Sequence, residues 1–508
     1  MNRRTLAYPA IACILLGAAC QDLDVTNPND PDRDRALTEP ETVEALLASS
    51  WLKVWARSHN TGTAYYPLPL IGDEMTATYS NNASLELSAV PRTAFDNTST
   101  SASHTVTRIM WLDYNQMLAA GNDVLRVIEN GLAIRTGGTD NTERARAFGA
   151  FMQGLGLGHL AMMFDRAHVA DETTDLENLP PYSAYPDVLA AGIAKLEEAI
   201  ENAETATFTV PDTWIPGTAL TSEQLARLAH TYIARLLVYS TRTPAERAAV
   251  DWQTVLAHVQ AGIQEDFGIN TDGFYTSFYL QRAQHATVSP QRASYRLIGP
   301  ADTSGAYQAW LATPVNERTR FDIETPDRRI TGPGGPTEDG TYFRYMATDA
   351  GFDPGRGTYR LSAYQWFRYG GRYNQGFIPL ISLDEMRLIE AEAHYHLGNH
   401  EIAAELVNVT RVGNGELPPV TADGVPEGTG CVPRTEEGAC GSLLDAIAYE
   451  RMIESVGLDA SRAYADRRGF GSLTSGTLLH FPVPSQELES LGIPNYTFGG
   501  VGGEWSAP

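Results

Sequence analysis

The stretch LDEMRLIEAEAHYHLGNHEIAAELVNVTR, residues 383–411, decides the fold. Apolar residues recur at helical spacing on both sides of Gly398, and glycine suits the left-handed residue that ends a helix. Ser382 can cap the first helix. Ala391 and Ala403 are small enough to let the two helices pack closely. Helix, glycine turn and helix is the pattern of a tetratricopeptide repeat, so this segment predicts a repeat-like helix pair.

Helical periodicity also runs through the first half of the chain and returns near its end. The expected helices are 38–55, 105–130, 144–165, 186–204, 222–240, 245–266 and 442–456. Thr243 and Pro244 give the helix over 245–266 a cap and a proline at its first position. The two helix pairs within 144–266 are interpreted as degenerate copies of the same repeat.

Three glycines, Gly154, Gly156 and Gly158, lie inside the helical pattern of 144–165. Their spacing resembles a phosphate-binding loop, but no strand precedes them. We therefore interpret them as places where neighbouring helices approach closely.

The middle of the chain, 267–379, has a different character. Gly, Pro, Asp and aromatic residues dominate it, and helical periodicity fades. A stretch of this length is too long for an ordinary loop, so it predicts an irregular functional insertion with short strands.

The N-terminus has the pattern of a lipoprotein signal. Arg3 and Arg4 precede a short apolar run, which ends in small residues and Cys20. We expect 1–19 to be removed, Cys20 to be lipidated, and the polar residues 20–37 to form a flexible tether. An ordinary cleaved signal with an incidental Cys20 is the alternative.

The remaining 38–508 is expected to form one domain. Its parts are helical repeats (38–266), the irregular ligand-side region (267–379), C-terminal helices (380–470) and coil (471–508).

The formal net charge of the 508 residues is −25. This charge disfavours nucleic acid and anionic membrane surfaces as partners and is compatible with neutral ligands such as sugars. The alternative is that the acidity only provides solubility. After the signal no apolar run is long enough to span a membrane.

Two cysteines, Cys431 and Cys440, flank a short segment rich in Glu, Gly, Pro and Thr. In an oxidising compartment, two nearby cysteines in a loop predict a disulfide. A metal-binding pair is the alternative, but no Cys or His with zinc-like spacing accompanies them.

Several motifs are similar to those of the SusD/RagB family of outer-membrane nutrient-binding lipoproteins. In chain order they are Asp327-Arg328-Arg329, the 384–393 helix with Leu397-Gly398, Asn408 to Arg411, Glu450-Arg451, Arg462 with Asp466-Arg467-Arg468, and FPVPSQEL at 481–488. The chain departs from the family pattern at Arg467, where the family has Leu. The acidic residues after Cys20 resemble the tag that sends such lipoproteins to the cell surface.

The resemblance implies a mostly α-helical, SusD-like scaffold of tetratricopeptide-like helix pairs with an irregular, aromatic-rich insertion. It implies a lipid-anchored protein of the outer membrane, facing the cell exterior. Such a protein would capture an oligosaccharide or other nutrient polymer and act as the lid of a TonB-dependent, SusC-like β-barrel transporter. It would have no enzymatic activity, cofactor, metal or nucleic-acid partner.

Catalytic signatures such as H-E-x-x-H, G-x-S-x-G and the P-loop are absent from the sequence. Two rival functions stay open. A lipid-anchored tetratricopeptide scaffold for envelope proteins would bind peptides and no glycans. A surface glycoside hydrolase would place two carboxyl groups about 5–9.5 Å apart in an open cleft.

Sugar binding requires flat aromatic faces together with amides and carboxylates. The segments 61–97 and 267–379 offer this combination. The candidate ligand-binding residues are Asp73, Tyr79, Asn81, Tyr307 and Trp310. Tyr79 and Trp310 lie among polar or small residues in predicted loops, which favours a binding role for them.

Overall fold

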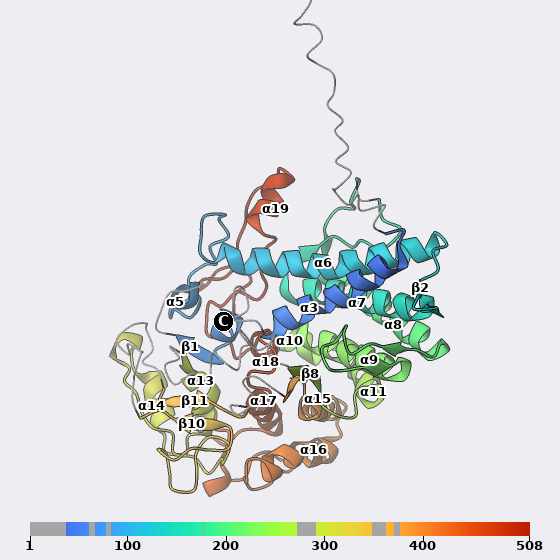
Figure 1. Cartoon of the computed structure of the whole chain (residues 1–508). Helices are drawn as coiled ribbons and strands as arrows, with labels where there is room; N and C mark the ends of the chain where they lie inside the picture. The colour runs from blue at the N-terminus through green and yellow to red at the C-terminus, as the bar shows by residue number, and fades with distance from the viewer. Residues whose placement is uncertain are drawn as a thin grey trace, which may run out of the picture.

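The computed structural model describes residues 37–59, 67–77, 83–175, 177–271, 291–347, 362–369 and 376–508. Helices dominate these residues, and the described strands occur only as two-stranded sheets (Figure 1). This is the mostly α-helical architecture that the sequence predicts. Within the described residues, no helix has the length and apolar character needed to cross a membrane.

The first half of the chain is a stack of long helices. They are α3 (Pro40–His59), α6 (His104–Glu129), α7 (Thr142–Met163), α8 (Tyr185–Thr205) and α9 (Ser222–Tyr239). Helix α7 packs against both α6 and α8, and α9 packs against α8 (Figure 1). Short strand pairs close three connections: β2 (Arg135–Thr136) with β3 (Thr139–Asp140), β4 (Arg166–Ala167) with β5 (Ser183–Ala184), and β6 (Thr209–Val210) with β7 (Leu220–Thr221).

The glycines of α7 face three different neighbours. A Cβ on Gly154 would lie 2.5 Å from Leu196 of α8, and one on Gly158 would lie 2.4 Å from Leu236 of α9. A Cβ on Gly156 would lie 2.8 Å from the backbone of α6. The interpretation as close helix packing is confirmed, because each glycine lets another helix approach α7.

The prediction of a single helix over 245–266 is wrong. The structure has α10 (Pro244–Ala248) and α11 (Trp252–Ala261) instead. Thr243 caps α10 as predicted, accepting a hydrogen bond from the backbone N–H of Glu246. Asp251 then caps α11 by accepting from the N–H of Thr254, so a second start signal breaks the helix.

The helix pair at 383–411 forms as expected. Helices α15 (Leu383–His396) and α16 (His400–Gly413) are joined at Gly398, whose φ is 81°. Ser382 caps α15 by accepting from the N–H of Glu385. Ala391 and Ala403 are fully buried in a shared apolar cluster. Helix α17 (Leu443–Glu454) packs against both members of the pair.

The middle region contains the short strands that were expected, together with short helices. The strands are β8 (Phe267–Thr271), β9 (Gln291–Ala293), β10 (Phe343–Tyr345), β11 (Tyr364–Trp366) and β12 (Gly376–Ile381). Strand β9 pairs with β1 (Met75–Ala77), β10 with β11, and β12 with β8, all antiparallel. The helices here are α13 (Tyr295–Ile298), α14 (Ala306–Ala312) and the 3₁₀ turns η3 (Gly299–Ala301) and η4 (Val315–Glu317).

The C-terminal segment ties the molecule together. It contains α18 (Arg462–Phe470) and α19 (Ser485–Ser490), so the expectation of coil throughout 471–508 is corrected at α19. Helix α19 is held in place by Leu488, whose side chain is buried in the main core. The N–H of Phe481 donates to the carbonyl of Met163 at 2.8 Å, which joins this segment to α7. The remaining short elements are α4 (Pro67–Ile71), α5 (Ser84–Leu87) and η6 (Gly428–Gly430).

Candidate functional site

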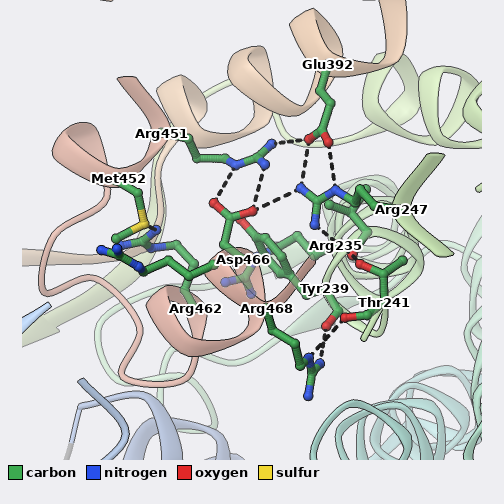
Figure 2. A network of polar contacts seen from close by, with 12 residues as sticks. Arg235, Tyr239, Thr241, Arg247, Glu392, Arg451, Met452, Arg462, Asp466 and Arg468 are labelled. Carbon is green, nitrogen blue, oxygen red and sulfur yellow. Dashed lines mark hydrogen bonds and ion pairs between the residues drawn. The ribbon is translucent and has the colours of Figure 1, made fainter. Parts of the chain in front are cut away.

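The motif residues of α15, α17 and α18 form a buried ionic network (Figure 2). Arg247 and Arg451 both donate to the carboxylate of Glu392, over 2.7–2.8 Å. The same two arginines donate to Asp466, over 2.7–2.9 Å. Burial by itself would raise the pKa of Glu392, but the two guanidinium groups outweigh it and hold that pKa well below its ordinary value of 4.5.

A second network surrounds Arg329, whose side chain is completely buried. Its guanidinium pairs with Asp327 at 2.7 Å, Glu450 at 2.6 Å and Glu454 at 2.9 Å. Arg411 is buried beside it and donates to the carbonyls of residues 418, 430 and 432. The motif residues therefore join helices to the middle region from inside the molecule and are not placed to touch a ligand.

The predicted ligand residue Asp73 is also buried. It accepts from Arg92 at 2.9 Å and from the hydroxyl of Thr474 at 2.7 Å. Burial would raise the pKa of Asp73, but Arg92 and the more distant Arg467 and Arg296 lower it overall. The carboxylate fixes a turn at the end of α4, where Asp73 has a φ of 55°.

Trp310 does not lie in a loop as predicted, because it belongs to α14, which also contains the candidate Tyr307. Only 2% of Tyr307 and 8% of Trp310 is exposed. The Arg318 guanidinium lies 4.1 Å from the Trp310 ring centroid. Trp310 and Asp73 do border one cavity, but its volume of about 20 Å³ is that of a water site and not of a sugar site. Tyr79 and Asn81 lie outside the described residues.

A large groove lies elsewhere, between the start of α9 and strand β8. It has a volume of about 1040 Å³ and is lined by residues from 217–228 and 263–270 and by Phe377 of β12. We call it the α9–β8 groove. Its size is at the upper end of the range for ligand sites, which suits an extended ligand.

Local hydrogen bonds fix the walls of the α9–β8 groove. Thr221 and Gln224 form a capping box at the start of α9. The Asn270 amide donates to the carbonyl of Gly217 at 2.9 Å. Asp266 accepts from the N–H of Leu383 at 2.8 Å and so ties this wall to α15. The walls are therefore set by the fold before any ligand arrives.

The groove also carries polar groups that the fold does not use. Among the described residues, the exposed side chains of Gln264 and Glu265 have no hydrogen-bond or ion-pair partner. Arg227 lies on the opposite wall, paired with Glu223 at 3.0 Å. Phe377 adds a half-buried aromatic ring. A carboxylate, an amide and a ring on fixed walls are the groups that recognise a polyhydroxylated ligand.

The sequence analysis did not predict this groove, because the groove crosses the expected boundary between the helical repeats and the ligand-side region. The irregular ligand-side region was expected to begin at 267, whereas 13 of the 17 residues that line the groove precede that position. The available signal was the run Gln264-Glu265-Asp266, three polar residues that begin two positions after Gly262, where α11 ends.

A smaller hollow of about 290 Å³ lies between 86–96, 101–103 and 476–478. Arg92, which holds Asp73, lines it together with Asp96 and Phe95. It overlaps the end of the predicted ligand segment 61–97, although none of the named candidate residues lines it. Its volume would take about one sugar unit and not a longer chain.

Cys431 and Cys440 are bonded in a disulfide, with their Cα atoms 5.0 Å apart. Glu427 lies beside them, its Oε2 3.4 Å from the Cys440 sulfur. These three residues form the one cluster of metal-ligating type within the described part of the chain. The disulfide uses both sulfurs, so thiolate ligation is not available in this state.

No family model matches the chain, and no curated protein matches its sequence. Solved structures do match its fold. A SusD superfamily protein from Bacteroides vulgatus ATCC 8482 aligns with a TM-score of 0.55 at 13% identity, over 89% of this chain and 97% of that chain. A SusD-like protein from Bacteroides fragilis NCTC 9343 aligns with a TM-score of 0.56 at 14% identity, over 86% and 88%.

A SusD homolog from Bacteroides thetaiotaomicron VPI-5482 aligns with a TM-score of 0.54 at 15% identity, over 89% of this chain and 96% of that chain. At these identities the likeness concerns the fold, and it extends over nearly the whole length of each protein. The chain therefore has a SusD-like fold, which is the fold that the motif resemblance implies.

Proposed function

We propose that this protein is a surface lipoprotein that captures a nutrient, with glycans as the favoured class, and presents it to a TonB-dependent outer-membrane transporter as that transporter's lid. The observation that carries the proposal is the α9–β8 groove, an open site of about 1040 Å³ with fixed walls and unused polar groups on a SusD-like scaffold. A binding protein needs this arrangement and no catalytic group.

Membrane attachment in this proposal rests on Cys20. The lipid on its thiol would hold the mature chain at the outer membrane. The tether 20–37 would give the lid room to move.

The scaffold alternative is less well supported. A tetratricopeptide scaffold binds peptides in a concave surface made by its repeats, whereas the α9–β8 groove also involves β8 and β12. The hydrolase alternative predicts a chemical change in a bound glycan.

The transporter role is tested by co-purification. Membranes of the native host are solubilised in mild detergent, the protein is captured through a C-terminal tag, and its partners are identified by mass spectrometry. The proposal predicts a stoichiometric β-barrel transporter. A periplasmic assembly factor in its place, or no partner, would favour the scaffold function.

A further inference from the structure

Helix α16 has apolar residues on its outer side as well as on its buried side. Ala403, Ala404 and Val407 face the core shared with α15 and α17. On the outer side 44% of Ile402 and 48% of Val409 is exposed. Burial in the fold therefore accounts for only one of the two apolar faces of this helix.

The outer apolar residues form a stripe. Ile402, Val409 and Val412 lie at positions i, i+7 and i+10, which fall on one side of a helix with 3.6 residues per turn. Val412 is 44% exposed. We call Ile402, Val409 and Val412 the α16 stripe. Single exposed apolar residues are ordinary, but a row of them on one helix is typical of an interface.

The position of α16 explains why its outer face is unpaired. In a repeat array each helix pair buries its face against the next pair, and the terminal pair is normally made polar. Helix α16 packs on α15 and α17, and it lies at the lower edge of the molecule in Figure 1. Its outer face thus has the composition of an internal repeat face at the end of the array.

Charge distinguishes between the possible occupants of the stripe. Glu401 and Glu405 are exposed on the same side of α16, and Glu405 lies between Ile402 and Val409. The one arginine of α16, Arg411, is fully buried and donates to backbone carbonyls. A second copy of this chain would bring acidic side chains together, which is unfavourable. A partner that presents apolar side chains together with Lys or Arg would be complementary.

We propose that the α16 stripe is a docking surface for a protein partner whose contact surface combines apolar and basic side chains. This inference rests on the proposed function, under which that partner is the β-barrel transporter. The apolar side chains would supply the binding energy, and Glu401 and Glu405 would orient the encounter.

The test is capture of the transporter by full-length variants expressed in the native host. Val409→Asp places a charge in the centre of the stripe. Ile402→Asp does the same near the N-terminus of α16, where an acid is compatible with the helix. Leu112→Asp is the matched control, since Leu112 is 45% exposed on α6 at the opposite edge of the molecule. Circular dichroism and the melting temperature verify that each variant is folded.

The proposal predicts that each stripe variant reduces the captured transporter by about tenfold or more, and that Leu112→Asp captures as much as the wild type. Glu401→Lys with Glu405→Lys should also weaken capture, most strongly at low salt. Equal capture by wild type and both stripe variants would overturn the docking surface and leave the proposed function standing. A wild type that captures no barrel would overturn both.

Light scattering of the purified full-length protein in detergent tests whether a second copy of this chain occupies the stripe. The proposal predicts one copy per particle once the detergent is accounted for. A dimer that Val409→Asp dissociates would assign the stripe to a second copy and overturn the proposal.

Discussion

At the scale of single residues, the charged side chains of this protein that matter most to its fold are inside it. Arg329, Arg451 and Glu392 are all fully buried and paired. A buried ion pair contributes little compared with a well-packed apolar pair, but removing one partner leaves the other charge unpaired, which is costly. These residues therefore determine which elements pack together. Replacing one of them should lower the stability of the fold, and any effect on ligand binding would follow from that loss.

Glu392→Gln tests this at the first network. The change leaves Arg247 and Arg451 with only the carboxylate of Asp466 to share and should reduce the free energy of unfolding by about 3–5 kcal/mol at neutral pH. Urea unfolding measures it. Glu390→Gln on the same helix, whose partner Gln260 is 3.5 Å away and exposed, is the control and should change stability by less than about 0.5 kcal/mol.

The pH dependence of the same variant has a defined sign. The folded state lowers the pKa of Glu392 below 4.5, so this carboxylate stabilises the fold above that pH and the stabilisation is lost as the pH falls. The difference in melting temperature between wild type and Glu392→Gln should therefore be constant near neutral pH and shrink below about pH 4.5. A difference that grows on acidification would contradict the assignment.

At the scale of elements, apolar periodicity predicts the long helices well, but it does not reveal a helix whose buried residues are charged. The boundaries of α6, α8 and α15 lie within a few residues of the prediction, because their apolar spacing and caps are local features of the sequence. Helix α18 shows no apolar stripe, because it is buried on all sides and its buried residues include the charged Arg462, Asp466 and Arg468. Its partners come from segments far away in the chain, and no local pattern reveals them.

Gly156→Ala tests the packing of α7. The added Cβ would lie 2.8 Å from the α6 backbone at Tyr114 and Leu118, which cannot rotate away. We expect a loss of about 1–3 kcal/mol in unfolding free energy despite the better helix propensity of alanine. Gly149→Ala is the control: its Cβ would make an ordinary contact at 3.5 Å with Leu125, so this variant should be neutral or up to about 1 kcal/mol more stable.

The candidate site was harder to predict than the fold for a physical reason. Aromatic and acidic residues are favoured both in sugar sites and in cores, and composition does not separate the two. Asp73 and Trp310 came together around one cavity, but buried partners surround both. The α9–β8 groove arises from the way α9 packs beside β8. None of its residues has a type or spacing that would mark a binding site in the sequence.

At the scale of the whole molecule, the proposed function requires that a lipid on Cys20 holds the helical body and its α9–β8 groove at the membrane. Cys20→Ala tests the tether. We expect this variant to be recovered in the soluble fraction of fractionated cells, whereas the wild type remains with the outer membrane. Metabolic labelling with a fatty acid reports the modification directly. Lipid label on the alanine variant would place the anchor elsewhere. So would unchanged membrane retention of the alanine variant in cells from which the transporter is deleted.

The proposed capture of a glycan is tested by binding of the purified protein to a glycan array, followed by calorimetry with the glycan that binds best. We expect saturable binding that Glu265→Gln with Gln264→Ala weakens by about tenfold or more. Glu197→Gln, an exposed change on α8 outside the α9–β8 groove, should leave the affinity unchanged, and chromatography should recover the glycan intact. Binding that ignores the groove variants, cleavage of the glycan, or no binding to any glycan on the array would contradict the account.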